Sequence, residues 1–172
     1  GLWLREQVIK HDLQAWVRDS TSQLCNIAVQ GPRSRDILKD LVWAKPTQPT
    51  LEELQLFRFS IARLGDFQGP SILVGRAGYT GELGYELLPK TADASKVWDA
   101  IVAAIEPVGG LVCGLGARDT LRTEMGYPLH GHELSLEITP VEASATWAIG
   151  WDKSGFLGSE VLKSQKAQGA KR

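Results

Sequence analysis

The sequence predicts an α+β fold in which a largely antiparallel sheet carries helices on one face. Two observations support this class. Residues 57–88 contain three strand-like runs joined by short turns, which favours an antiparallel meander. Directly after them comes an apolar stripe at helical spacing, the mark of a helix that packs on a sheet: Ala94, Val97, Trp98, Ile101 and Ile105.

The elements before the meander alternate between helix and strand. Residues 2–10 predict a helix, and residues 23–30 predict a short apolar strand that ends at Gly31-Pro32. Proline near a first turn then predicts a helix through about Leu41. Thr50-Leu-Glu-Glu53 has the pattern of a capping box, so we expect another short helix to begin there.

Residues 57–64 alternate between apolar and mostly polar side chains, as a half-buried strand does. Residues 71–75 and 85–88 predict the next two strands. Thr91 is the expected N-cap of the helix that follows.

The last third of the chain gives weaker signals. We expect a short strand at 111–115, a helix at 116–124, a strand at 147–151 and a last helix at 158–166. The whole chain, residues 1–172, is predicted to form a single domain. Four tryptophans are expected to anchor the core of that domain: Trp16, Trp43, Trp98 and Trp147.

Composition excludes several classes of function. The net charge of −1 gives no electrostatic reason to expect a nucleic acid or an anionic membrane as partner. Two lone cysteines, Cys25 and Cys113, make neither a disulfide framework nor a zinc site. No apolar run approaches the roughly 20 residues of a membrane span. We therefore expect a soluble, intracellular protein.

The run Gly75-Arg-Ala-Gly-Tyr-Thr-Gly-Glu-Leu-Gly-Tyr-Glu86 is the most informative segment. It lacks the Lys-Ser/Thr of a phosphate-binding loop, a strand follows it, and Glu82 and Glu86 would repel a phosphate. Two interpretations stay open: a hairpin turn that needs glycine for its conformation, or a carboxylate site for a cationic or amidine-like edge. If Glu82 and Glu86 belong to one continuous strand, they share a face. If Gly84 bends the chain between them, only one of the two points into a pocket.

A second group of functional side chains lies within residues 114–124. Arg118 and Arg122 are four residues apart on one side of the predicted helix. Arg118 either pairs with Asp119, Glu124 or a distant acid, or offers its planar guanidinium to a carboxylate or an aromatic ring. The pair His130 and His132 has no third ligand at a recognisable spacing, so no metal site is expected. No nucleophile motif is present either.

Several collinear segments together resemble the glycine cleavage system T-protein, an aminomethyltransferase family. The similarity runs from about Trp3 to the end of the chain, and five segments carry it: Ala28-Val-Gln-Gly-Pro-Arg33, Gly78-Tyr-Thr-Gly-Glu-Leu-Gly-Tyr-Glu86, Gly114-Leu-Gly-Ala-Arg-Asp-Thr-Leu-Arg122, Ile138-Thr-Pro-Val-Glu142 and Phe156-Leu-Gly-Ser-Glu160.

The resemblance implies that the aminomethyl group on the lipoyl arm of a carrier, the H-protein, reacts with tetrahydrofolate, so that ammonia leaves and methylenetetrahydrofolate forms. It implies that Glu86 contacts the folate and that Arg118 binds substrate, with Tyr79 and Glu82 as further candidates in the same site. A pterin presents adjacent N–H donors that suit a carboxylate, and folate carboxylates suit an arginine. No residue of this chain is assigned as a catalytic acid or base. The implied location is the cytoplasm, or the mitochondrial matrix in a eukaryote.

Family members have a segment before the position of Trp3 and a small C-terminal β-barrel domain after that of Arg172. The chain therefore resembles the middle part of the folate-binding fold, and one face of its sheet is expected to lie uncovered. Two alternatives remain: the folate domain of a sarcosine- or dimethylglycine-oxidising enzyme or of a demethylase, and a non-catalytic folate-binding module. The latter carries a cysteine motif that residues 76–82 lack.

Overall fold

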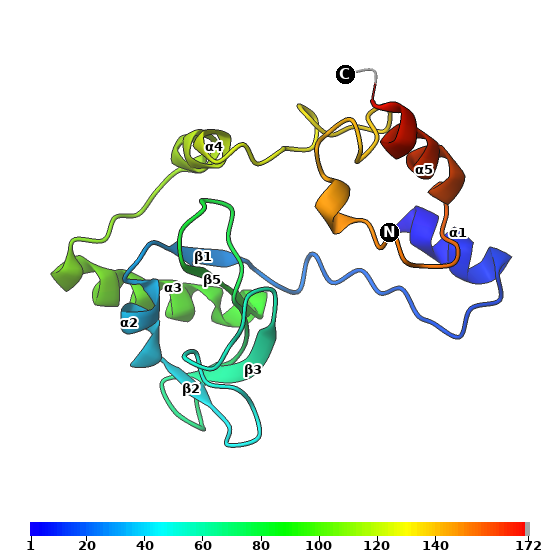
Figure 1. The fold of residues 1–172 in the computed structure, drawn as a ribbon. Coiled ribbons are helices and arrows are strands. Elements are labelled where there is room, and N and C mark those ends of the chain that lie inside the picture. The colour runs from blue at the N-terminus through cyan, green and yellow to red at the C-terminus, as the bar shows by residue number, and fades with distance from the viewer. Residues whose placement is uncertain (171–172) are drawn as a thin grey trace. The chain divides into compact units, whose positions relative to one another are not determined.

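The computed structural model describes residues 1–170, which form two compact units. The first unit is Gly1–Gly114 and the second is Leu115–Arg172, and each is described by itself (Figure 1). The first unit begins with helix α1 (Leu2–Lys10), as expected, and contains the sheet. The prediction of one domain over residues 1–172 stays a prediction.

The sheet has five strands in the order β1-β5-β4-β3-β2, and every neighbouring pair is antiparallel. The predicted meander is present as β3, β4 and β5, whereas β2 had no prediction. The strands are β1 (Ile27–Gln30), β2 (Val42–Ala44), β3 (Phe59–Leu64), β4 (Ser71–Gly75) and β5 (Gly84–Pro89). These pairings confirm the α+β class with an antiparallel sheet.

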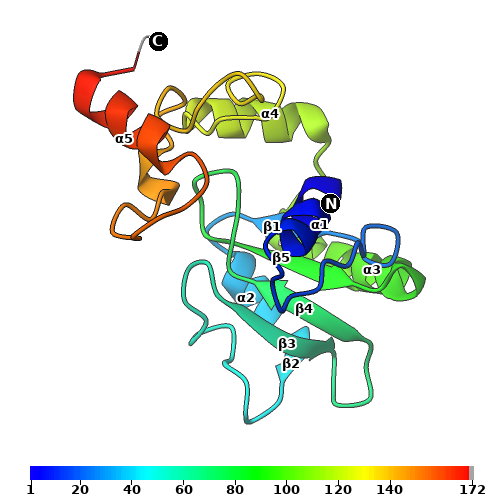
Figure 2. The ribbon, with the colours of Figure 1, turned by 90° about the vertical axis from the view of Figure 1, so that its right-hand side faces the viewer.

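One face of the sheet is buried against helices α2 (Ser34–Lys39) and α3 (Ala94–Ile105), which contact each other (Figure 2). Alternate strand residues point to this face, so their side chains share one core with those of the helices. The buried apolar residues of the strands and of the two helices are Val29, Leu38, Ala62, Leu64, Ile72, Val74, Tyr85, Leu87, Val97 and Ile101.

The opposite face of the sheet carries residues that alternate with the core residues. On β3, Phe59 and Ile61 are 62% and 52% exposed, although both are large and apolar. Glu86 on β5 belongs to this face as well, because it alternates with the buried Tyr85 and Leu87. The expected uncovered face is therefore the one on which Glu86 lies.

The predicted tryptophan anchors are wrong. Trp16 is fully exposed, Trp147 and Trp98 are 78% and 42% exposed, and Trp43 is only half-buried. The buried core consists of aliphatic side chains and one aromatic residue, Tyr85. An apolar side chain is buried only where a facing element covers it, and single-sequence patterns do not show which tryptophans are covered.

Several element ends also differ from the predictions. Strand β1 begins only at Ile27, and residues 111–115 form no strand. Thr91 does not cap α3, because its Oγ1 donates to the Ser22 carbonyl at 3.1 Å and the short 3₁₀ helix Thr91–Asp93 precedes α3.

The predicted capping box does form. The Thr50 N–H donates to the Glu53 carboxylate at 3.0 Å, and the Glu53 N–H donates to Thr50 Oγ1 at 3.4 Å. It closes a turn at residues 51–53 rather than a helix.

The second unit contains α4 (Leu115–Glu124) and α5 (Ser159–Gln168), close to the two helices predicted there. The strand expected at 147–151 is absent, and a short 3₁₀ helix, Thr146–Ala148, lies there instead. Among the residues described in this unit, the one classed as buried is a charged side chain, Arg122.

Candidate ligand-binding site

The glycine-rich run forms the loop of the β4–β5 hairpin, residues 76–83, and backbone hydrogen bonds hold both of its ends. At the first end, the Arg76 N–H donates to the Arg58 carbonyl at 2.9 Å. At the second end, the Leu83 carbonyl accepts the N–H of Gly31 at 2.8 Å. The loop is thus tied to the strands on either side of the hairpin, and its tip between these anchors is free to present side chains.

Glycine is required in and beside this loop for different reasons at different positions. Gly81 has a φ of +77°, a conformation that glycine adopts without strain. Gly78 and Gly84 have no positive φ, but a Cβ at either position would overlap the side-chain amide of Gln30. Gly84 itself does not bend the chain, because it is the first residue of β5 and pairs in register with Gln30.

Glu86 lies on β5, half-buried, on the uncovered face of the sheet. Its cross-strand neighbours are Ala28 on β1 and Gly75 on β4. Both neighbours are small, so no long side chain stands directly beside the carboxylate. Among residues 1–170, the Glu86 carboxylate makes no ion pair and accepts no hydrogen bond. A carboxylate in this position is available to a ligand with N–H donors.

The other two candidates of the run lie on the loop itself. Tyr79 is half-buried and Glu82 is exposed. The Glu82 N–H donates to Thr80 Oγ1 at 3.5 Å, a weak contact that belongs to the turn. Glu82 and Glu86 therefore do not belong to one continuous strand, and the strand holds only Glu86.

The two arginines of the second motif lie on α4 in the second unit and have different environments. Arg118 is exposed, whereas Arg122 is buried. Asp119 pairs with Arg122, its Oδ1 lying 2.7 Å from Arg122 Nη2. Asp119 is thus engaged by Arg122, and the alternatives for Arg118 stay predictions.

Arg122 connects α4 to the loop that follows it. Its Nη1 donates to the Glu133 carboxylate at 2.9 Å and to the Tyr127 carbonyl at 3.2 Å. The hydrogen bond with Asp119 raises the pKa of the guanidinium. The pKa of Glu133 is lowered, first by a hydrogen bond from the Leu129 N–H and further by the Arg122 charge. These contacts, together with its burial, give Arg122 a structural role in the unit.

Sequence reasoning missed two residues, Gln30 and Arg122, in the roles that the structure gives them. The spacing of Asp119 and Arg122, three residues apart on a helix, is a signal for an ion pair. No local pattern marks Gln30, because it meets the glycine-rich loop only across the sheet, about fifty residues further along the chain.

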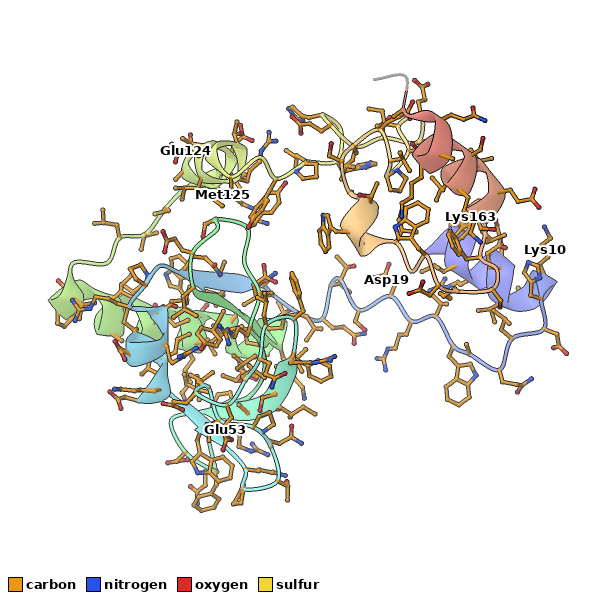
Figure 3. The ribbon with its side chains drawn as sticks, in the orientation of Figure 1. Lys10, Asp19, Glu53, Glu124, Met125 and Lys163 are labelled. Atoms are coloured by element: carbon orange, nitrogen blue, oxygen red, sulfur yellow. The ribbon has the colours of Figure 1, made fainter. Side chains whose placement is uncertain are left out.

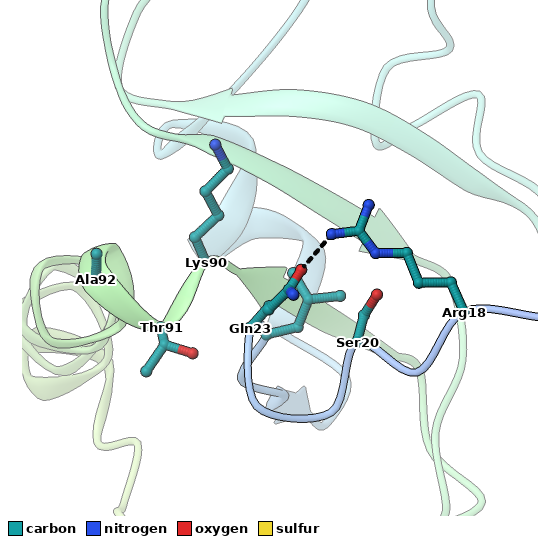
Figure 4. A pocket seen from close by; sticks show the side chains of 7 residues that line it. Arg18, Ser20, Gln23, Lys90, Thr91 and Ala92 are labelled. Carbon is teal, nitrogen blue, oxygen red and sulfur yellow. Dashed lines mark hydrogen bonds between the residues drawn. The ribbon is translucent and has the colours of Figure 1, made fainter. Parts of the chain in front are cut away.

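A cavity of about 430 Å³ lies elsewhere in the first unit (Figure 4). Its lining residues are Arg18, Ser20, Gln23, Leu24, Lys90, Thr91 and Ala92. The Arg18 guanidinium donates to the side-chain oxygen of Gln23 at 3.0 Å, so two of the lining residues are joined. None of the predicted site residues lines this cavity.

Within residues 1–170, no group of three or more His, Cys, Asp or Glu side chains is arranged to hold a metal ion. In the same part of the chain, no helix combines the length and the apolar character needed to span a membrane.

Comparison with known proteins identifies the class to which this fold and loop belong. Residues 2–153 match the model of the GCVT N-terminal domain, so the chain belongs to this family.

Three relatives make the relationship more specific, and each is named aminomethyltransferase. The relative from Parafrankia sp. is 46% identical over 156 residues, which are 91% of this chain and 40% of the relative. The relative from Mycobacterium tuberculosis H37Rv is 50% identical over 146 residues, covering 85% of this chain and 37% of the relative. The relative from Mycobacterium leprae TN is 50% identical over 150 residues with the same coverage. The chain thus spans about two fifths of the length of these relatives.

Proposed function

We propose that this chain supplies part of the tetrahydrofolate site of an aminomethyltransferase that acts in glycine cleavage. The observation that carries the proposal is the half-buried Glu86 carboxylate, unpaired within residues 1–170, beside the anchored glycine-rich loop. Adjacent N–H donors of a pterin can both reach one carboxylate, and such charge-assisted hydrogen bonds are stronger than neutral ones. Membership of the GCVT N-terminal domain family and the names of the relatives support this choice of ligand.

The loop residues complete the proposal for this site. The half-buried ring of Tyr79 offers an apolar surface to a flat heterocycle. Glu82 at the exposed loop tip is a weaker candidate, since it is fully hydrated before any ligand binds. Arg118 is proposed separately, as an exposed guanidinium on α4 that binds a carboxylate of the ligand.

In the proposed reaction, the aminomethyl group arrives on a lipoylated carrier of the H-protein type and the cofactor is tetrahydrofolate. We assign binding residues and no catalytic acid or base to this chain. The bacterial relatives support a cytoplasmic location as part of the same proposal.

Isothermal titration with tetrahydrofolate tests the Glu86 assignment. We expect Glu86→Ala to weaken binding by about tenfold or more, because hydrogen bonds to a charged group are lost. The matched control is Glu106→Ala, an exposed glutamate in the short helix after α3, which should bind as the unaltered chain does. Equal affinity of the Glu86→Ala variant and the unaltered chain would remove Glu86 from the site.

Arg118 needs its own test. Arg118→Ala is expected to weaken binding by about tenfold, and Arg118→Lys should restore little, because a lysine cannot reproduce a planar two-point contact. Lys163→Ala on α5 serves as the control for losing one exposed positive charge in the same unit (Figure 3). If the Lys163 variant loses affinity as well, the loss in the Arg118 variants is an effect of net charge, and Arg118 makes no specific contact with the ligand.

A further inference from the structure

We propose that Gln30 is the positioning residue of the candidate folate site, because it fixes both the glycine-rich loop and the peptide group that carries Glu86. This inference rests on the proposed function, since it assigns the element that orients the ligand-binding carboxylate. Gln30 is the last residue of β1, directly opposite Gly84 of β5.

The side-chain amide of Gln30 makes two hydrogen bonds that join separate parts of the hairpin. Its Nε2 donates to the Ala77 carbonyl and to the Tyr85 carbonyl, each at 3.2 Å. Ala77 lies at the start of the loop and Tyr85 lies just beyond its end. One amide group therefore joins the two ends of the loop, next to the backbone anchor that Gly31 makes with Leu83.

The second of these bonds acts directly on Glu86. The Tyr85 carbonyl and the Glu86 N–H belong to one planar peptide unit, so a bond to the carbonyl fixes the orientation of both. Gln30 and Glu86 also project to the same face of the sheet, since Ala28 pairs with Glu86 and Gln30 is two residues further along β1. Losing this amide would remove one of the contacts that orient this peptide unit, in addition to its pairing with β1 and β4.

Gly78 and Gly84 both lie against the Gln30 amide, in space that a larger residue would occupy. A Cβ at Gly78 or at Gly84 would overlap Gln30 Oε1, and neither backbone requires glycine for its φ. Oε1 itself is buried without a conventional hydrogen-bond partner and faces the Cα hydrogens of the two glycines. Two of the glycines in the run are thus needed for the Gln30 side chain.

This arrangement makes a double-mutant test possible. Gln30→Met keeps the length of the side chain but removes both donors, and Gly84→Ala keeps the donors but displaces the amide. We expect each to weaken tetrahydrofolate binding by about tenfold, the worth of two modest hydrogen bonds. Gln30→Ala should have a similar effect, and adding Gly84→Ala to it should cost nothing more, because the vacated space now accommodates the new methyl group. Gly155→Ala, where a Cβ meets open space, is the control.

A second readout does not depend on a ligand. Hydrogen exchange of residues 76–83 should accelerate in Gln30→Met and in Gly84→Ala, while that of β3 and β4 stays unchanged. Additive losses of affinity in the double variant, or unchanged loop exchange in Gln30→Met, would overturn the role of Gln30. If the unaltered chain does not bind tetrahydrofolate while the loop exchange responds as expected, the proposed function fails but the role of Gln30 in holding the loop stands.

Discussion

Different forces stabilise the first and the second unit of the chain. The first unit, Gly1–Gly114, contains every buried apolar side chain among the described residues, gathered between one sheet face and two helices. The described part of the second unit, residues 115–170, buries none, and its one buried residue is the charged Arg122. The first unit therefore depends on apolar burial, which is independent of pH, and the second on polar contacts, which are not.

The contrast has a consequence for where function resides. Glu86 and Gln30 belong to the sheet of the first unit, whose buried face is closely packed and whose other face is open. A site on such strands is held to a defined geometry by the core beneath it. Arg118 lies on a helix whose fold rests on the ion pairs of its neighbour Arg122, so its position responds to conditions that leave the sheet unchanged.

The largest expected effect comes from the apolar core. Leu87→Ala, at a fully buried position of β5, should lower the free energy of unfolding of the first unit by about 2–5 kcal/mol, through lost burial and a cavity. Native-state hydrogen exchange of the β3–β5 amides is the measurement, with exchange of α5 as the internal control. Equal acceleration in α5 would show that the two units unfold together and would remove the contrast.

Removing a polar contact inside that core should lower the free energy of unfolding by less than Leu87→Ala does. The Tyr85 hydroxyl accepts from Arg35 Nε at 2.9 Å and donates to the Leu51 carbonyl at 3.0 Å. Tyr85→Phe leaves both partners unpaired, so we expect a loss of about 1–2 kcal/mol in the same unit. Urea unfolding, monitored by exchange of the sheet amides, measures it, and no loss would mean that water replaces the hydroxyl.

Acidification should act on the second unit first. The pKa of Glu133 is lower in the folded chain than its ordinary value of 4.5. Its stabilising contribution is therefore complete above about 4.5 and is lost as the pH falls through the lower folded value. Exchange of residues 127–134 should accelerate over this range while the sheet stays protected.

The matched variant for this pH test is Glu133→Gln, which should exchange faster at neutral pH and lose the acid-dependent step. A step that persists in Glu133→Gln would assign it to another carboxylate, such as Asp119, the second ion-pair partner of Arg122.

The smallest expected effect is that of Trp16→Ala. Trp16 is fully exposed, so the free energy of unfolding should change by less than about 0.5 kcal/mol. Thermal unfolding of the whole chain measures this. A larger loss would mean that Trp16 is covered and would restore the tryptophan anchor that the sequence predicted.

Local sequence patterns were sufficient to predict the strands and helices whose periodicity is strong. The alternation of residues 57–64 and the apolar stripe around Val97 and Ile101 predicted β3 and α3 within two residues. They failed where a neighbour in space decides the outcome. The apolar residues 111–114 are exposed and form no strand because no neighbouring strand pairs with them.

The sequence by itself determined the fold class, the hairpin with its loop of glycines, and the candidate status of Glu86. Periodicity, turn chemistry and motif order are local properties that a single chain displays directly. Only the tertiary structure decided which face of the sheet is buried, which arginine of α4 is used for stability, and why Gly78 and Gly84 are glycines. Each of these depends on side chains that meet across strands or around a helix, and such meetings follow from packing rather than from local sequence.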